Sequence, residues 1–189
     1  MNTHVLQGGF NAPPQDGARA FRSIMNAMAR PGRIFDVSGA LPPTPMSVAC
    51  GTVILTLCDP ETPIHLAPSR DIEEIRHWIT FHCGAPFVRA SEAQFVIGNW
   101  EEMLPLNQFK QGEAQYPDRS ATLIIEEPEI RNSGAALRGP GIKDVQYFSL
   151  PTIAAFQQNA ALYPLGIDFI FCADSQIAGL ARTTRVSEE

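Results

Sequence analysis

Apolar residues recur every three or four positions in two stretches of the chain, each of which follows an aspartate. This spacing is typical of a helix that buries one face. We expect a helix that Asp16 caps and that the Pro-Gly pair at 31–32 ends, and a second helix that Asp71 caps and that residues 84–86 end. The apolar positions are Phe21, Ile24, Met25 and Met28 in the first helix, and Ile72, Ile75, Ile79 and His82 or Cys83 in the second.

Residues 46–57 are continuously apolar, up to an Asp-Pro pair at 59–60. A run of about twelve apolar residues is long for a strand, so it predicts a buried helix. Residues 101–109 are interpreted as a helical turn or short helix. A last helix is expected over 153–162, with Pro151 near its start.

Shorter runs with β-forming residues predict strands. The expected strands cover 33–37, 63–66, 87–88, 94–97, 121–126 and 134–137, and a terminal hairpin joins 163–172 to 176–181 through an Ala-Asp-Ser turn. Strands and helices alternate early in the chain, while adjacent strands dominate late. This order predicts an α/β fold in which helices sandwich a mixed β-sheet, as one domain over 16–189 after a flexible N-terminal segment over 1–15.

Composition restricts the class of protein. The chain has 189 residues, 44% of them hydrophobic and 18% charged, which suits one globular domain. The net charge of −6 argues against nucleic-acid binding, which usually needs a basic face. No apolar run approaches the roughly 20 residues of a membrane helix, and no signal peptide is evident. The four cysteines form no C-x-x-C pair, so we expect reduced thiols and a cytoplasmic location.

Motifs of self-contained catalysis are absent from the sequence. His77 and His82 are five positions apart, so on a helix they point about 140° away from each other and do not share a metal ion. No serine lies in a G-x-S-x-G elbow, and no H-E-x-x-H motif is present. We therefore expect no metal site, and the catalytic residues stay unknown.

Two segments near the C-terminus concentrate arginine, lysine and glycine. The loop with Arg138, Gly139, Gly141 and Lys143 resembles a phosphate loop but lacks the G-x-x-x-x-G-K-[ST] pattern. Its Pro140 also removes a backbone donor. The loop is therefore either a tight turn or a contact loop for a partner or an anionic ligand. Arg182 and Arg185 form the second candidate contact segment.

Asp168 interrupts an apolar run between Ile167 and Phe169. A buried carboxylate needs a partner, because burying it alone costs several kcal/mol or forces it to bind a proton. Arg182 and Arg185 are the nearest cations in the sequence. We expect Asp168 to be partly buried and held by Arg182 or by the terminal hairpin, in a structural role.

Several segments, in order, resemble the PhnH family of the bacterial carbon–phosphorus lyase system. The segments are F-R-x-x-M-x-A-M-A-R-P-G at 21–32, L-T-L-C-D-x-x-T-P at 55–63, F-H-x-x-A-P at 81–86, A-T-L-I at 121–124, L-x-G-x-G-I at 137–142, P-L-G-I-D at 164–168 and R-T-T at 182–184. The resemblance extends from about residue 21 to residue 186. The chain differs at Ala181, where the family commonly has a proline, and this difference concerns the rigidity of one turn.

The resemblance implies both a fold and a function. The fold would be similar to the large domain of pyridoxal-phosphate-dependent transferases, without the cofactor. The function would be that of a subunit working with G, I and J subunits, in which an alkylphosphonate displaces adenine from the ribose of ATP. The resemblance further implies a homodimer in isolation and no catalysis by the chain alone. The chain has only two lysines to form a Schiff base, Lys110 and Lys143, both expected in loops, which agrees with a fold that holds no cofactor.

Two other functions remain open from the residues alone. One is a stand-alone small-molecule enzyme on an α/β scaffold. The other is a homo-oligomer that binds anionic metabolites. Co-purification with G, I and J subunits would separate the favoured function from both.

Overall fold

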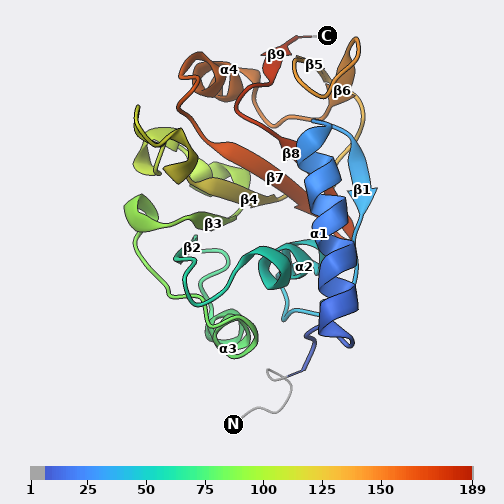
Figure 1. Ribbon diagram of the computed structural model, residues 1–189, viewed down its shortest axis with the longest axis vertical. Coiled ribbons are helices and arrows are strands. Elements are labelled where there is room, and N and C mark those ends of the chain that lie inside the picture. Colours follow the sequence, from blue (N-terminus) through green and yellow to red (C-terminus); the bar gives the residue numbers. More distant parts are fainter. Residues whose placement is uncertain (1–6, 189) are drawn as a thin grey trace.

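The computed structural model describes residues 7–188, which form a six-stranded mixed sheet with helices on both sides and a small three-stranded sheet at one end (Figure 1). The strand order in the large sheet is β1-β8-β7-β4-β3-β2. Strands β2, β3, β4 and β7 are parallel to one another; β8 is antiparallel to β7, and β1 at the edge is antiparallel to β8. The small antiparallel sheet has the order β6-β5-β9.

The elements have the following bounds. The helices are α1 (Pro13–Ala29), α2 (Val48–Leu57), α3 (Glu73–His82) and α4 (Ile153–Ala161). The strands are β1 (Ile34–Asp36), β2 (Ile64–Leu66), β3 (Phe95–Gly98), β4 (Thr122–Glu126), β5 (Ala135–Arg138), β6 (Gln146–Phe148), β7 (Asp168–Ala173), β8 (Gln176–Leu180) and β9 (Arg185–Ser187). Short 3₁₀ turns lie at Ala90–Glu92, Trp100–Met103, Leu106–Gln108 and Pro117–Arg119.

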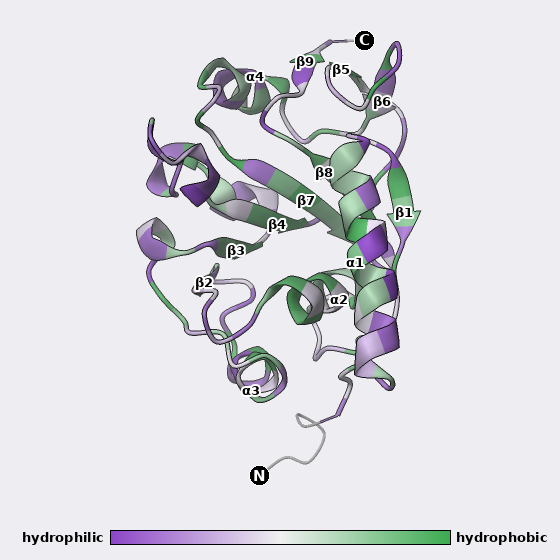
Figure 2. Ribbon diagram, viewed as in Figure 1, coloured by the Kyte–Doolittle hydropathy of each residue, from purple (hydrophilic) through white to green (hydrophobic). Residues whose placement is uncertain are grey.

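Alternate residues of the central strands supply two cores, one on each face of the sheet. Ile124 and Ile170 belong to the core that also contains buried residues of α1, α2 and α3. Helix α2 lies within this core and is apolar on all sides, as Figure 2 shows by its mostly green colour. Helix α1 packs against β8 at Gly179, where a Cβ atom would lie 2.7 Å from the carbonyl carbon of Ala27. The missing side chain therefore permits close contact between this helix and the sheet.

The opposite core contains a cluster of aromatic side chains. Leu123, Phe169 and Phe171 project from the sheet toward α4, the 3₁₀ turns and the small sheet. Phe156 of α4 lies with its ring centroid 4.9 Å from that of Phe169 and 4.8 Å from that of Trp100. These contacts attach α4 and the first 3₁₀ turn after β3 to the same part of the sheet.

The structure confirms the expected α/β class and the mixed sheet with helices. The predicted buried helix, the last helix and the terminal hairpin are present as α2, α4 and β7–β8, and the strands expected at 33–37, 63–66, 94–97, 121–126 and 134–137 are present as β1 to β5. The turn of the hairpin contains Asp174, whose φ of 49° is the left-handed conformation that Asp tolerates better than most residues.

Four details of the prediction were wrong. Helix α1 begins at Pro13, so Asp16 lies in its first turn, where its carboxylate accepts a hydrogen bond from the Ala12 N–H at 2.8 Å. The N-cap of α3 is Ile72, because Asp71 instead forms an ion pair with Arg76. The strand expected at 87–88 is a single bridge. Two three-residue strands, β6 and β9, had no strong pattern and were missed.

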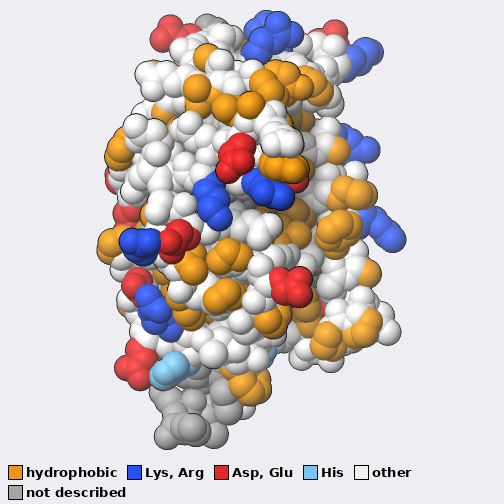
Figure 3. Space-filling view, turned by 60° about the vertical axis from the view of Figure 1, so that its left-hand side comes forward, with side chains coloured by type: hydrophobic (Ala, Val, Ile, Leu, Met, Phe, Trp, Pro, Cys, Tyr) orange, Lys and Arg blue, Asp and Glu red, His pale blue; other side chains and the backbone are white. Residues whose placement is uncertain are grey.

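Within residues 7–188, none of the helices has the length and apolarity that crossing a bilayer requires. On the face shown in Figure 3, acidic and basic side chains lie beside one another with apolar ones between them. The predicted N-terminal segment 1–15 is described only in part, since residues 1–6 lie outside the described range and residues 13–15 belong to α1.

Candidate functional site

The carboxyl ends of the four parallel strands meet at one edge of the large sheet, and polar residues follow each strand there. Arg70 comes after β2, Asn99 after β3, Glu127 after β4 and Asp174 after β7. In open α/β sheets, ligands bind outside this edge. A crevice of about 540 Å³ opens at it, lined by these four residues and by Pro45, Ser47, Glu101, Glu126 and Pro128. This crevice is the candidate site.

A buried ion pair forms the floor of the crevice. Arg70 and Glu126 are only 8% and 6% exposed, and the Arg70 Nε–H donates to Glu126 Oε2. The rest of the guanidinium donates to Asn99 Oδ1 at 2.9 Å and to the Ser69 carbonyl at 3.3 Å. Such buried charges are tolerated because each has several hydrogen-bond partners.

The second oxygen of Glu126 fixes the start of α2. Glu126 Oε1 accepts a hydrogen bond of 2.7 Å from the backbone N–H of Ser47, the N-cap of that helix. A carboxylate is favoured at this position because a helix N-terminus carries a partial positive charge. One pair of residues therefore connects β4, the loop after β2, the loop after β3 and the start of α2.

A second carboxylate, that of Glu102, holds together the two loops that line the crevice. Glu102 accepts hydrogen bonds from the Ser69 N–H at 2.7 Å, from the Ser69 hydroxyl and from the Asn99 N–H at 3.0 Å. Burial disfavours its ionised form, but the hydrogen bonds from Ser69 and Asn99 outweigh this effect. The pKa of Glu102 is therefore below its usual value.

Glu127 has the opposite environment. Its Oε1 is buried, and among residues 7–188 no donor reaches it. Burial raises the pKa of Glu127, and repulsion from Glu101 raises it further. The free acceptors of the crevice therefore lie on its wall, on Glu127, Glu101 and Asp174, whereas the floor is internally neutralised.

These charges determine the chemistry that the crevice supports. Its lining holds four carboxyl groups, from Glu101, Glu126, Glu127 and Asp174, and one guanidinium, from Arg70. It favours cations and hydrogen-bond donors and repels phosphate groups. Within the described residues, no group of three or more His, Cys, Asp or Glu side chains has the arrangement that holds a metal ion.

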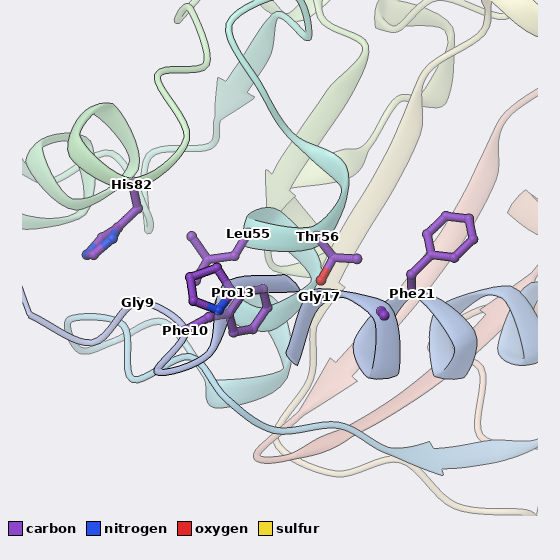
Figure 4. Close-up of a pocket in the computed structure, with 9 residues that line it drawn as sticks. Gly9, Phe10, Pro13, Gly17, Phe21, Leu55, Thr56 and His82 are labelled. Carbon is purple, nitrogen blue, oxygen red and sulfur yellow. The ribbon is translucent and has the colours of Figure 1, made fainter. Parts of the chain in front are cut away.

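A second hollow lies between α1, α2 and the end of α3 (Figure 4). Phe10, Phe21 and Leu55 make it largely apolar, and His82 lies at its margin. One ring nitrogen of His82 lies 3.3 Å from the Gln7 carbonyl oxygen. The lining of this hollow contains no charged pair, so it offers less chemistry than the crevice.

The segments with Arg138 and Arg185 lie next to each other, on β5 and β9. The two arginines are direct cross-strand partners, and both side chains are exposed. Lys143 is exposed in the loop that follows β5. None of these three cations forms an ion pair with any residue in 7–188.

Backbone conformation and close contacts explain why this loop contains glycine at positions 139 and 141. Gly139 and Gly141 have φ values of 139° and 82°. A Cβ atom on Gly141 would lie 2.0 Å from the Ala29 carbonyl oxygen at the end of α1, and one on Gly139 would lie 3.1 Å from the Thr183 carbonyl oxygen. The loop therefore packs against the end of α1 and against the segment that leads into β9.

Arg182 is turned inward, away from Arg185. Its backbone N–H and Nε–H donate to Asp168 Oδ1 at 2.8 and 3.2 Å, and one terminal nitrogen lies 2.5 Å from Asp168 Oδ2. The other terminal nitrogen donates to the Pro117 carbonyl at 2.8 Å. The predicted pairing of Asp168 with Arg182 is therefore present, and it commits Arg182 to a structural role.

Sequence reasoning missed the crevice. Arg70, Asn99 and Glu126 belong to no recognised motif. The available signal was positional, because each polar residue lies at or just after the end of a predicted strand. The separation of Arg138–Lys143 and Arg182–Arg185 from this edge was not visible in the sequence.

Comparison with known proteins identifies the family. The family model described as "Bacterial phosphonate metabolism protein (PhnH)" matches residues 8–187. The chain is 35% identical, over 99% of its length and 98% of the relative's, to the "Alpha-D-ribose 1-methylphosphonate 5-triphosphate synthase subunit PhnH" of Rhizobium meliloti (strain 1021). It is 26% identical, over 94% of its length and 88% of the relative's, to the "Putative C-P lyase subunit protein HtxG" of Stutzerimonas stutzeri. The resemblance seen in the sequence motifs is thus confirmed over almost the whole chain, which belongs to the PhnH family of bacterial phosphonate metabolism proteins.

Proposed function

We propose that the chain is a subunit of a carbon–phosphorus lyase complex and supports synthesis of ribose 1-methylphosphonate 5-triphosphate. The observation that carries this proposal is the 35% identity to a subunit of that synthase over nearly the full length of both chains. The partners would be subunits of the G, I and J types, and the complex would act in the cytoplasm. In isolation the chain would form a homodimer.

The positions of the charged groups support the role of a subunit. The crevice at the sheet edge repels the phosphate groups of such a product, and its one strong cation, Arg70, is already paired with Glu126. Three cations that form no ion pair with any residue in 7–188 lie away from the crevice, two of them on the β5–β9 sheet and one in the loop after β5. We propose that Arg138, Arg185 and Lys143 contact an anionic group of a partner subunit or of the shared ligand, with Gly139 and Gly141 shaping the loop.

The cross-strand pair gives this contact a physical basis. Like charges directly opposite each other on neighbouring strands destabilise a sheet. Arg138 and Arg185 form such a pair, and the Ser187 hydroxyl lies 3.5 Å from one Arg138 terminal nitrogen. A carboxylate or phosphate placed between the two guanidinium groups would remove this repulsion, so binding of an anion is favoured there.

Reconstitution tests the proposal. The purified chain would be mixed with separately purified G, I and J subunits, ATP and methylphosphonate, and adenine release would be followed by chromatography. We expect turnover from the full mixture only, with none from the chain alone or from the mixture without it. Adenine release by the lone chain, or equal release without it, would contradict the proposal.

The arginine pair has its own test in the same assay. If Arg138→Ala prevents co-purification with the partners, the β5–β9 sheet contacts a subunit. If the complex remains intact but turnover is lost, the loop contacts the ligand. The exposed Arg89, which is already paired with Glu92, provides the matched control Arg89→Ala.

A further inference from the structure

We infer that the crevice at the carboxyl edge of the sheet receives an arginine or lysine side chain from a partner subunit. This inference rests on the proposed function, because it assumes the multi-subunit complex. The inference goes beyond the proposed function by assigning an interface to a specific part of the fold and by naming the chemistry of the incoming group.

The crevice carries an excess of negative charge. With all groups ionised, four carboxylates and one guanidinium leave an excess of three negative charges in one hollow. The Arg70–Glu126 pair satisfies itself, so the excess is located on Glu101, Glu127 and Asp174. No cation of the described chain forms an ion pair with any of these three residues.

The hydrogen bonding of Glu127 is incomplete within the described residues. Its neighbour Glu126 accepts from both Arg70 and Ser47, whereas the buried Oε1 of Glu127 accepts from no group within residues 7–188. Buried carboxylate oxygens without donors are rare in stable proteins. An external guanidinium or ammonium group that reaches Glu127 would supply a donor and balance the charge.

A basic side chain of another protein fits the crevice better than a phosphate-bearing ligand or a metal ion. The phosphate-rich ligands of the proposed reaction carry the wrong charge for this hollow, and the described residues include no metal-binding cluster. The crevice is also built on a rigid edge, since the Arg70 contacts and the Ser47–Glu126 hydrogen bond hold the loops around it. A preorganised acidic hollow at a subunit surface suits a basic side chain of another protein, because complementary charges set the specificity of an interface.

The test uses a variant in which the wall loses its charge and keeps its shape. It combines Glu101→Gln, Glu127→Gln and Asp174→Asn, and it leaves Arg70 and Glu126 intact. The control removes the same number of charges at exposed sites on other elements, with Glu61→Gln, Glu74→Gln and Glu113→Gln. Binding of each tagged chain to the preassembled G, I and J subunits would be measured by biolayer interferometry at two salt concentrations.

We expect the wall variant to bind at least tenfold more weakly than wild type, with a smaller dependence on salt, and the control to bind within twofold of wild type. Equal binding of the wall variant and wild type would overturn the inference while leaving the proposed function intact. Absence of binding by wild type itself would instead contradict the proposed function.

Two further measurements keep the result interpretable. If the triple variant has lost the wild-type circular dichroism spectrum, the single variant Glu101→Lys would replace it, since Glu101 is exposed and lines the crevice. Glu101→Lys should weaken binding by a similar factor. Unchanged binding of this variant would overturn the inference. ATP is the second probe, in ¹⁵N NMR of the isolated chain. Shifts of the Glu127 and Asp174 amides on addition of ATP would show that the crevice accepts an anion and would also overturn the inference.

Discussion

Asp168 and Arg182 illustrate at the residue scale how the chain accommodates charge at the start of a central strand. Asp168 is the first residue of β7, and its side chain is 23% exposed, against 12% for Arg182. The Arg182 guanidinium also donates to Ser120 Oγ and to the Pro117 carbonyl, so it connects the terminal hairpin to the segment before β4. The ion pair is thus part of a small network at the amino edge of the sheet.

We predict that Asp168→Ala lowers the free energy of unfolding by about 2 kcal/mol or more, because it leaves a largely buried guanidinium without its counter-ion. Asp168→Asn is the matched variant, since it keeps an acceptor for the Arg182 backbone N–H and should cost less. Urea unfolding of both variants measures the difference. A wild-type midpoint for Asp168→Ala would refute the structural role.

Glu127 gives a prediction about pH. Its pKa is raised above the usual 4.5, mainly by burial and additionally by Glu101. The folded state therefore holds this proton more tightly than the unfolded state. Its contribution to stability is complete below pH 4.5 and is lost as the pH rises through the raised value.

Glu127→Gln removes this titration. The variant should therefore lose less stability than wild type between pH 4.5 and pH 7, while Glu61→Gln should follow the wild-type curve. Urea midpoints measured across this pH range would give the comparison. If the wild-type and Glu127→Gln curves were parallel, the pKa of Glu127 would not be raised in the folded state.

At the scale of elements, the loop after β5 depends on its contact with the end of α1. Gly141 has φ of 82°, and a Cβ atom there would lie 2.0 Å from the Ala29 carbonyl oxygen. Gly134, before β5, also has a positive φ, of 96°, but a Cβ atom would lie no closer than 3.5 Å to another residue. Replacing Gly134 therefore tests the cost of backbone strain alone, whereas replacing Gly141 tests backbone strain together with a steric clash.

We predict that Gly134→Ala costs about 1 kcal/mol of stability, from left-handed strain alone, and that Gly141→Ala costs about 3 kcal/mol, because α1 and the loop must also move apart. Thermal unfolding of the two variants would measure this difference. Equal losses would mean that the loop moves away from α1 without cost.

The elements were predictable where the hydrophobic pattern was strong. Helix α2, strand β4 and the β7–β8 hairpin came from long apolar runs, because such runs must be buried whatever the tertiary contacts. Strands β6 and β9 were missed; each has three residues and pairs only with β5, which lies between them. The start of α3 was misplaced because the side chain of Asp71 pairs with Arg76, five positions further along the chain, and does not cap the helix.

At the scale of the whole molecule, the candidate site could not be predicted from the sequence. Arg70 and Glu126 are 56 positions apart, and Asn99 lies between them in the chain. Only the parallel order of β2, β3 and β4 brings them to one edge, and that order depends on long-range strand pairing. The Asp168–Arg182 pair was predictable because its members flank a single hairpin.

The positions of the lysines in the whole molecule bear on whether the chain can bind pyridoxal phosphate covalently. Lys110 and Lys143, the only two lysines, are both exposed. We propose that the fold resembles the large domain of pyridoxal-phosphate-dependent transferases, and that without a lysine in the crevice it forms no internal aldimine. Incubation with pyridoxal phosphate and borohydride, followed by mass spectrometry, should give no adduct specific to the native fold. A stable adduct on Lys143 in the folded chain, absent from the urea-unfolded control, would contradict this.

The pairing of β1 with β8 has a consequence for how the chain is made. Helix α1 and strand β1 are synthesised long before β8, yet they lie against it (Figure 1). The Gly32 N–H donates to the Gly179 carbonyl at 2.9 Å, across nearly 150 positions. Such distant contacts form late in folding. A nascent chain that stops before residue 176 therefore lacks the strand against which its first helix packs, so part of the apolar surface of α1 stays accessible to proteases and chaperones until β8 has been made.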